Sequence, residues 1–122
     1  MIPFTDDHHL VRETVRSLVE DKIAPRAQEL DHTHEFPRQA LAELAGLDLL
    51  GSYFPEQYGG AGMDFVTFAV TMEELARGCA STALTVAAHT SLCMAPIDSL
   101  GTHEQKLKYL PPLCRLALPS KC

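Results

Sequence analysis

The spacing of hydrophobic residues predicts a helix near the start of the chain. Apolar residues recur at intervals of three and four from Leu10 to Ile23, as one buried stripe of an amphipathic helix would require. Thr5, followed by two aspartates, suits the N-terminus of that helix. Pro25 is expected to bend or end the helix, although residues 26–30 can continue it after a kink.

A second, shorter helix is predicted after a polar loop at residues 31–35. Pro37 is suited to its first turn. Its apolar residues are Leu41, Leu44 and Leu47. Residues 51–62 then hold four glycines and one proline, so they predict a loop.

Three further helical patterns occupy the second half of the chain. The first spans residues 64–78, and its apolar face holds Phe65, Phe68, Ala69, Met72, Leu75 and Ala76. Residues 80–94 are apolar and uncharged, and such a helix must be covered, because a surface helix needs a polar face. Pro96 is expected to end it. A capping box at residues 102–105 then predicts a last helix that ends before Pro111.

These patterns predict an all-α fold. No segment shows the strict alternation of a strand, so we expect an orthogonal or bundle-like helical domain of about five to six helices. The chain has 122 residues, of which 46% are hydrophobic, and that length is enough for one hydrophobic core.

Charge and composition narrow the classes of partner. The net charge of -6 is spread along the chain without a basic stripe, which argues against nucleic acid. No apolar run is long enough to span a membrane, and the N-terminus lacks signal and transit features. We therefore expect a bacterial cytoplasmic protein, or a mitochondrial matrix protein if this is a mature eukaryotic chain. The four cysteines lack a Cys-x-x-Cys spacing, and Cys79 and Cys93 are expected to be reduced thiols in the core.

Three polar motifs carry little specific chemistry. The glycines of residues 59–62 follow no predicted strand and precede no Lys-Ser, so they favour a tight connector with positive φ angles over a phosphate cradle. His32 and His34 lack further ligands at a recognisable spacing, and no metal site is predicted. Glu73 and Glu74 are adjacent on a helix, so their side chains diverge and cannot act as an acid–base pair on one substrate. Their spacing predicts a polar helix face instead.

His89 is the histidine whose surroundings invite a functional interpretation. On an ideal α-helix it shares one small, largely apolar face with Thr85, Ala88 and Leu92. Spacing alone favours a packed core helix with one satisfied histidine. The alternative is a face that lines a tunnel for an apolar chain, and both interpretations remain open at this point.

An ordered set of segments resembles the N-terminal helical domain of the acyl-CoA dehydrogenases over roughly residues 4–113. The segments are Ile23-Ala24-Pro25, Phe36-Pro37, Leu49-Leu50-Gly51, the run from Pro55 to Gly62, Glu73-Glu74-Leu75-Ala76, His103-Glu104-Gln105-Lys106 and Tyr109-Leu110-Pro111. The segment Cys79-Ala80-Ser81-Thr82 looks closest to the short-chain and branched-chain members.

The resemblance implies an oxidoreductase that acts on the CH–CH bond of an acyl-CoA substrate. In that family FAD removes a hydride from the β-carbon after a carboxylate takes the α-proton, and the electrons pass to an electron-transfer flavoprotein. The N-terminal domain supplies one wall of the acyl pocket. Matching the pair Ser91-Leu92 to the family assigns that wall to Thr85, Ala88, His89 and Leu92.

The resemblance also implies that the chain is a fragment. The family's β-domain, its glutamate base and most of its FAD site would follow residue 113, so no catalytic or cofactor-binding residue is assigned here. We expect the chain alone to be inactive and not to retain FAD. Residues 1–113 form the family-like domain, whereas residues 114–122 depart from the family pattern and are expected to be a disordered tail.

Two alternatives stay open. The chain could be a free-standing, non-catalytic interaction module whose uncharged helix and Tyr58 loop form an exposed apolar patch that binds a partner or another copy. It could also be the N-terminal domain of an acyl-CoA oxidase or a related flavin monooxygenase, because those enzymes share this domain. In the parent enzyme, oligomers would form through the missing domains.

Overall fold

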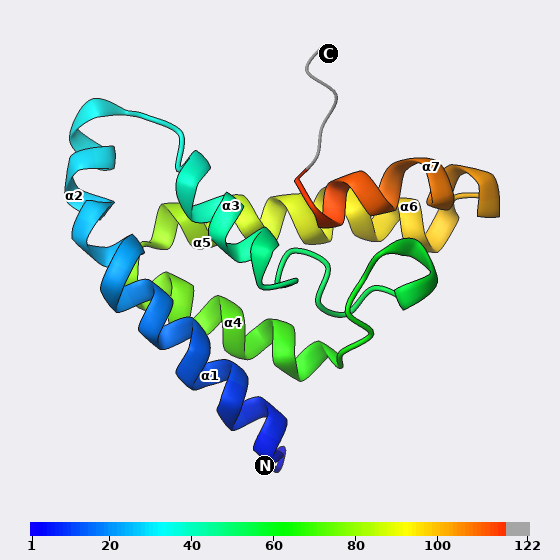
Figure 1. Ribbon diagram of the computed structural model, residues 1–122, viewed down its shortest axis with the longest axis horizontal. Coiled ribbons are helices and arrows are strands. Elements are labelled where there is room, and N and C mark those ends of the chain that lie inside the picture. The colour runs from blue at the N-terminus through cyan, green and yellow to red at the C-terminus, as the bar shows by residue number, and fades with distance from the viewer. Residues whose placement is uncertain (117–122) are drawn as a thin grey trace.

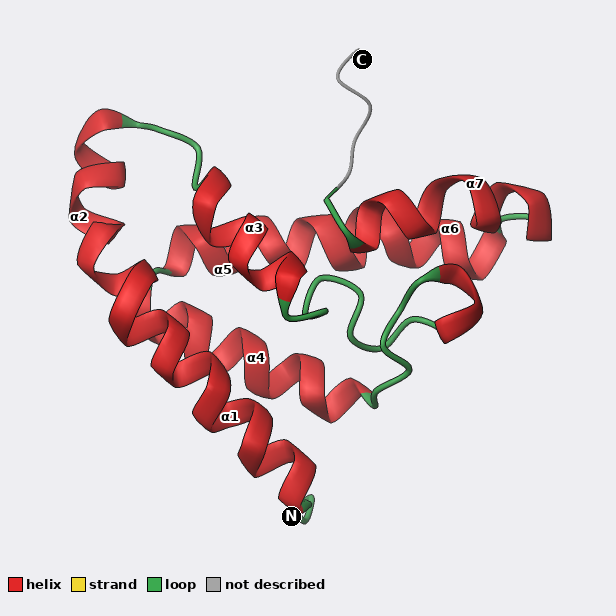
Figure 2. Cartoon of the chain, in the orientation of Figure 1, coloured by secondary structure: helices red, strands yellow, loops and turns green. Residues whose placement is uncertain are grey.

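The computed structural model describes residues 1–116, and within them every regular element is a helix (Figures 1 and 2). The elements are α1 (Asp6–Leu18), the π-helical segment η1 (Val19–Ile23), α2 (Ala24–Thr33), α3 (Arg38–Gly46), the 3-10 turn η2 (Glu56–Tyr58), α4 (Phe65–Gly78), α5 (Ala80–Ala87), the π-helical segment η3 (Ala88–Met94), α6 (Ala95–Leu100) and α7 (His103–Cys114). The predicted all-α fold is confirmed.

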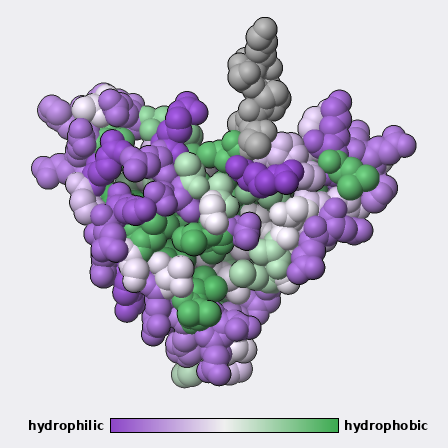
Figure 3. Space-filling model, viewed as in Figure 1, coloured by the Kyte–Doolittle hydropathy of each residue, from purple (hydrophilic) through white to green (hydrophobic). Residues whose placement is uncertain are grey.

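The helices pack against one another in neighbouring pairs. α1 lies beside α4, and α4 packs in turn against α5. α5, η3 and α6 run end to end as one long rod, with α7 alongside α6 (Figure 1). Hydrophilic residues follow the outer edges of the face shown in Figure 3, while apolar residues gather near its centre. None of the helices in the described part of the chain is long and apolar enough to cross a membrane.

A hydrogen bond joins the start of α1 to the start of α4. Thr5 caps α1, because its hydroxyl accepts from the amide of His8 while its own amide donates to Nδ1 of His8 at 3.0 Å. Nε2 of His8 therefore carries the ring proton and donates to Asp64 at 2.7 Å. Asp64 caps α4 by accepting from the amide of Thr67. That bond and the one from His8 lower the pKa of Asp64.

The helices continue past the prolines that were expected to stop them. Pro25 and Pro96 each lie in the first turn of an α-helix that follows a π-helical segment directly. The prediction that Pro96 ends its helix is wrong, whereas the predicted continuation beyond Pro25 is confirmed. A proline ring clashes with the carbonyl four residues earlier in a regular α-helix, and the wider turn before it can absorb that clash.

The last helix also differs from its prediction. α7 has the predicted capping box, in which Thr102 and Gln105 exchange bonds, but it runs through Pro111 and Pro112 to Cys114 instead of ending before Pro111. Leu110 and Cys114 are buried on the domain side of this helix. Their packing favours the helical conformation where propensity alone does not.

Two buried clusters make up the interior. The aliphatic core joins α1, η1, α3, α4 and α5, and it contains Val15, Val19, Ile23, Leu41, Leu44, Leu49, Leu50, Leu75, Ala83 and Val86. The aromatic core lies between the loop before α4 and helix α7, and it contains Phe54, Tyr58, Met94, Leu110 and Cys114. The apolar stripes predicted for the first two helices supply Val15, Val19, Ile23, Leu41 and Leu44 of this core.

Several apolar residues predicted to be buried are exposed. Leu10 and Phe65 are each 63% exposed, and Leu47, which follows the last residue of α3, is 42% exposed. Cys79 is a buried free thiol, as predicted, but Cys93 is exposed, so the prediction of a core thiol at position 93 is wrong. The prediction for Cys93 rested on the apolar segment around it, and η3 places this residue on the exposed side of that segment.

The domain extends slightly past the predicted boundary at residue 113. Cys114 is the last residue of α7 and only 4% exposed, so it belongs to the packed domain instead of the expected tail. Residues 117–122, the remainder of that tail, lie outside the described residues.

Candidate functional site

The four predicted wall residues lie on the rod formed by α5 and η3. Thr85 belongs to α5, while Ala88, His89 and Leu92 belong to η3. An α-helix would place all four on one face, but a π-helical turn contains more residues than an α-helical turn. Leu92 is therefore rotated away from the position that the α-helical spacing predicts.

The side chains of these residues point to different neighbours. The hydroxyl of Thr85 donates to the carbonyl of Ser81 at 2.9 Å, and Thr85 borders a cavity shared with the loop between α2 and α3. His89 is half-buried and donates from Nε2 to the carbonyl of Leu113 at 3.0 Å, at the end of α7. Leu92 is 77% exposed. The structure thus places the four residues along one rod without gathering them around one cavity.

The bond made by His89 agrees with the satisfied histidine considered from the sequence. A backbone carbonyl can only accept, so Nε2 of His89 must be the protonated ring nitrogen. Leu113 is one of the last residues of α7, and its carbonyl also accepts from the amide of Leu116 at 3.3 Å. His89 therefore joins η3 to the end of α7, and the assignment of its ring to an acyl pocket stays a prediction.

The surface around these residues is apolar and uncharged. Leu84, Leu92 and Leu100 are 71%, 77% and 86% exposed, one on each of α5, η3 and α6. No charged residue occurs from Ala80 to Ile97. Exposed apolar surface of this kind usually marks a site that another protein surface or a ligand covers.

Cys79 is a thiol for which the sequence suggested only a packing role. It lies at the start of α5, where Sγ accepts from the hydroxyl of Thr82 at 3.1 Å. Burial raises the pKa of the Cys79 thiol, but hydrogen bonds from Ser81 and Thr82 outweigh burial and leave that pKa lowered. The residue is 8% exposed, which restricts access to the sulfur.

The glycine-rich loop before α4 is a connector and does not fit the phosphates of a flavin. The amides of Gly59, Gly60, Ala61, Gly62 and Met63 each donate to a carbonyl of the same loop. Gly59 has a φ of 88°, as the tight-connector interpretation predicts, and a Cβ on Gly60 would lie 2.1 Å from the carbonyl oxygen of Phe54. Because these five amides already have acceptors, the glycines cannot cradle an anion in this conformation.

Glu74 is buried, so the prediction that both adjacent glutamates form a polar face is wrong for Glu74. Its side chain is 3% exposed and accepts from Arg16 at 2.7 and 3.1 Å and from Arg77 at 3.1 Å. The bonds from Arg16, followed by those from Arg77, hold the pKa of Glu74 below its usual range despite burial. A carboxylate held in this way is a structural anchor and not an available base.

Glu73 and the loop histidines remain at the surface. Glu73 is exposed and pairs with Arg12 at 3.0 Å. His32 and His34 are both exposed. Within residues 1–116 no three His, Cys, Asp or Glu side chains come together in a group that could hold a metal ion.

The family model and the related sequences that match this chain all point to the same family. The model of the family described as acyl-CoA dehydrogenase, N-terminal domain, matches residues 5–117. A short-chain specific acyl-CoA dehydrogenase of Clostridium acetobutylicum is 40% identical over 111 residues, which cover 91% of this chain and 29% of that protein. A mitochondrial isovaleryl-CoA dehydrogenase of Solanum tuberosum is 41% identical over 112 residues, with 90% and 27% covered.

A solved structure agrees in fold as well. The butyryl-CoA dehydrogenase of Megasphaera elsdenii matches with a TM-score of 0.87 and 36% identity, over 94% of this chain and 31% of that one. The chain therefore spans less than a third of the length of the relatives it matches.

Proposed function

Because this chain belongs to the acyl-CoA dehydrogenase family, we propose that it acts as the N-terminal domain of an FAD-dependent oxidoreductase that dehydrogenates acyl-CoA at its α and β carbons. The match over residues 5–117 carries this proposal. The exposed, uncharged surface of α5 and η3 supports it, since a domain of a larger enzyme needs such a surface for contact with its other domains.

Within the enzyme, the rod formed by α5 and η3 supplies one wall of the acyl pocket. Thr85, Ala88, His89 and Leu92 are the residues assigned to that wall. Leu92 offers apolar surface to an acyl chain, and the small side chain of Ala88 leaves room beside it. The hydrogen bond from His89 to the carbonyl of Leu113 fixes the position of η3 relative to the end of α7, and it thereby orients the wall.

The remaining parts of the active site come from outside this chain. The amides of residues 59–63 already have acceptors within their loop, and the buried Glu74 is committed to two arginines. Catalysis requires that base, cofactor and substrate be held within reacting distance of one another. The chain alone is therefore inactive and retains no FAD.

The proposal also covers partners and location. Acyl-CoA is the substrate of the whole enzyme, and an electron-transfer flavoprotein takes up its electrons. The short-chain and isovaleryl-CoA enzymes among the relatives favour a short or branched acyl group. The cytoplasm of a bacterium is the proposed location, with the mitochondrial matrix as the equivalent in a eukaryote.

The exposed leucines also favour a second candidate, a free-standing interaction module. A module would use Leu84, Leu92 and Leu100 to bind a partner protein, and it would need no flavin domain. A domain swap separates the two candidates. Residues 5–113 would replace the aligned segment of the Clostridium acetobutylicum short-chain acyl-CoA dehydrogenase, and oxidation of butyryl-CoA by the purified, FAD-loaded chimera would be measured.

We expect the chimera to bind FAD and to turn over butyryl-CoA. A chimera that folds and holds FAD but does not oxidise butyryl-CoA would argue against the dehydrogenase proposal. Within an active chimera, Ala88→Leu should lower kcat/KM by about tenfold or more, because it narrows the proposed pocket. Ala69→Leu is the matched control, since Ala69 is exposed on α4, and it should leave kcat/KM unchanged.

A further inference from the structure

Helices α1 and α7 each begin with a capping box, and the two boxes differ in one residue type. At the start of α7, the hydroxyl of Thr102 accepts from the amide of Gln105 at 3.2 Å, and the amide of Thr102 donates to Oε1 of Gln105 at 2.9 Å. At the start of α1, Thr5 has the same role, but its partner is His8. A glutamine amide does not titrate, whereas histidine is the side chain that changes charge between about pH 5 and about pH 8.

Both ring nitrogens of His8 make hydrogen bonds inside the domain. The residue is 4% exposed, Nδ1 accepts from the amide of Thr5 at 3.0 Å, and Nε2 donates to Asp64 at 2.7 Å. An imidazolium carries a proton on each nitrogen and accepts at neither. Protonation of the ring therefore leaves Nδ1–H opposite the N–H of Thr5, so that two donors face each other. The bond from Nε2 to Asp64 then joins two opposite charges.

The other side-chain hydrogen bonds of histidine among the described residues survive protonation. Nε2 of His89 donates to the carbonyl of Leu113, and a second proton on that ring leaves the bond in place. Nδ1 of His103 lies 2.9 Å from the hydroxyl of Tyr58, and a hydroxyl can accept as well as donate. In this part of the chain, His8 is thus the histidine whose acceptor nitrogen faces a group that can only donate.

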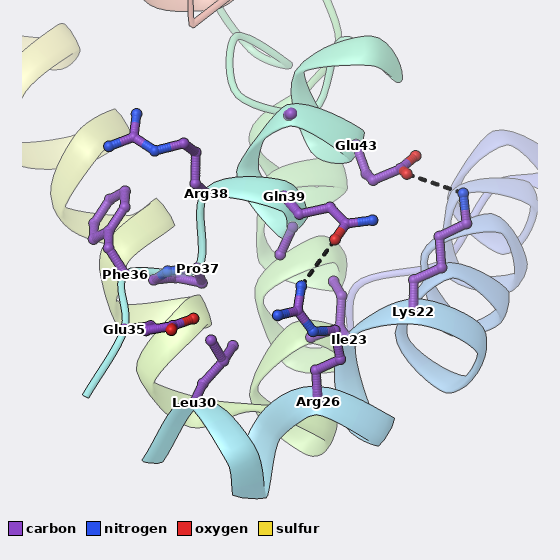
Figure 4. A pocket seen from close by; sticks show the side chains of 12 residues that line it. Lys22, Ile23, Arg26, Leu30, Glu35, Phe36, Pro37, Arg38, Gln39 and Glu43 are labelled. Carbon is purple, nitrogen blue, oxygen red and sulfur yellow. Dashed lines mark hydrogen bonds and ion pairs between the residues drawn. The ribbon is translucent and has the colours of Figure 1, made fainter. Parts of the chain in front are cut away.

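Side-chain bonds between other helical segments depend on residues that keep their charge. Figure 4 shows two of these bonds beside the cavity between α2 and α3, where Lys22 donates to Glu43 at 3.0 Å and Arg26 donates to Gln39 at 2.8 Å. Lysine, arginine and glutamate do not ordinarily titrate between about pH 5 and about pH 8. A change in this range at the start of α1 can therefore occur while these contacts persist.

The surroundings of His8 can hold its charged form in place. The charged and titratable groups near the ring are Asp7, His9 and Arg12 from α1 and Asp64 from the start of α4. Phe4 packs edge-on against the ring, with centroids 5.7 Å apart. A buried cation needs a counter-charge, and Asp64 supplies one. The ring can thus stay between the two helices after protonation.

We propose that His8 is a pH-sensitive switch for the first turn of α1. The neutral ring closes the capping box with Thr5 and joins the start of α1 to the start of α4. The protonated ring loses the bond from the Thr5 amide, so the box opens, but it keeps the bond to Asp64. Residues 1–4 are exposed, so the release of Thr5 frees the chain before α1 without opening the core. This switch requires neither a flavin nor the proposed dehydrogenase activity.

Nuclear magnetic resonance of the ¹⁵N-labelled 122-residue chain tests the proposal. A coupling through the hydrogen bond joins the amide nitrogen of Thr5 to Nδ1 of His8, and we expect it at about pH 8 and not at about pH 5. Its loss should follow the titration of the ring nitrogens of His8. The coupling persisting on a doubly protonated ring overturns the proposal. Absence of the coupling at about pH 8, or a ring that stays neutral down to about pH 5, also overturns it.

Hydrogen exchange gives a second measure of the same bond. After correction for the intrinsic exchange rate at each pH, the protection of the Thr5 amide should fall about fivefold as the ring titrates. The amide of Thr102 is the internal control, because its acceptor is Gln105, and its protection should not change over this range. Equal changes at the two amides would contradict the proposal, because they would show a general loosening of the helix ends.

Substitutions identify the titrating group. His8→Gln gives the first box the side chain of the second, so the protection of the Thr5 amide should become independent of pH. His9→Gln is the matched control at the exposed neighbouring position and should keep the fall of about fivefold. A fall of the same size in His8→Gln contradicts the proposal, because another group would then open the box. If circular dichroism shows that a variant is unfolded, the coupling in the unaltered chain decides.

Discussion

One backbone arrangement, a π-helical segment followed by Ala-Pro at the start of an α-helix, occurs twice in the chain, and we call it a joint. The residues exposed at the two joints differ in charge. At the first joint, η1 is followed by Ala24-Pro25, and at the second, η3 is followed by Ala95-Pro96. In both places a π-helical turn precedes a proline in the first turn of an α-helix. The backbone therefore does not explain why the two joints present such different residues to their surroundings.

Charged residues surround the first joint. Glu20, Asp21 and Lys22 are exposed on η1, and two of them pair with neighbouring helices, Glu20 with Arg77 at 3.0 Å and Lys22 with Glu43 at 3.0 Å. The second joint exposes Ser91, Leu92 and Cys93, none of which is charged.

The difference indicates which surface faces water. Ion pairs across a joint are compatible with permanent hydration, whereas an apolar exposed turn is stabilised only when something covers it. The charged residues at the first joint are thus suited to face water. The uncharged, exposed residues at the second joint agree with the proposed contact with other domains. Substitutions at and around the two joints can test this contrast.

The largest expected effect is at Glu74 on α4, which accepts from Arg16 on α1 and from Arg77 on α4, next to the first joint. Glu74→Ala leaves Arg16 and Arg77 without their shared carboxylate and should lower the free energy of unfolding by about 3 kcal/mol in urea titrations. Glu73→Ala is the matched control at an exposed position and should cost less than about 1 kcal/mol. Equal losses for the two variants would show that burial of Glu74 does not matter.

A steric change should produce the next largest effect. A Cβ on Gly78 would lie 2.1 Å from Cγ1 of Val19, so Gly78→Ala forces α4 away from η1 and should cost about 2 kcal/mol. Gly46→Ala, where a Cβ meets no atom within 4 Å, should be neutral or stabilising by up to about 1 kcal/mol. Thermal unfolding followed by circular dichroism compares the two, and a stable Gly78→Ala variant would rule out close packing at the first joint.

Acid should weaken the first joint in a way that depends on Glu74. The folded-state pKa of Glu74 lies below its usual value of 4.5, so its stabilisation is present above that pH and is lost as the pH falls through the lower folded-state value. Glu74→Gln should therefore flatten the fall in stability between about pH 5 and about pH 3, measured by urea titration at each pH. A fall as steep as that of the unaltered chain would assign the acid sensitivity to other carboxylates.

The smallest effect is expected at the second joint. Leu92→Ser should change the stability of the isolated chain by less than about 0.5 kcal/mol, because Leu92 is 77% exposed and buries little surface. Val19→Ala, in the equivalent π-helical segment, should cost about 2 kcal/mol, because Val19 is 1% exposed. A large loss from Leu92→Ser in urea titration would mean that the second joint is already covered within this chain.

The sequence predicted the helices better than their junctions. Capping residues and three-and-four spacing located α1 and the start of α7, because those signals act over a few neighbouring residues. The passage of the chain through Pro96 and Pro111 was missed. Proline is locally unfavourable inside a helix, and only the packing of residues such as Met94 and Leu110 makes continuation favourable.

The same limit applies to the candidate site. Spacing identified the rod that carries Thr85 and His89, but the predicted common face assumed an α-helix throughout, and η3 is π-helical. Glu74 was predicted to be a surface residue because it is an acidic residue adjacent to Glu73 on a helix. Arg12 and Arg16, four residues apart on α1, were a signal that an acidic partner faces that helix, yet only the fold shows which glutamate it is.

The π-helical turn of η3 determines how α6 is rotated about the rod axis relative to α5. Removing one residue from that turn and restoring a regular α-helix would rotate α6 by about 100° about the rod axis relative to α5. Leu100 and Pro96 would then face new directions, and α7, which packs beside α6, would have to follow or lose its contacts. Relatives of this chain can therefore keep nearly every residue and still differ in domain orientation through the gain or loss of a single amino acid.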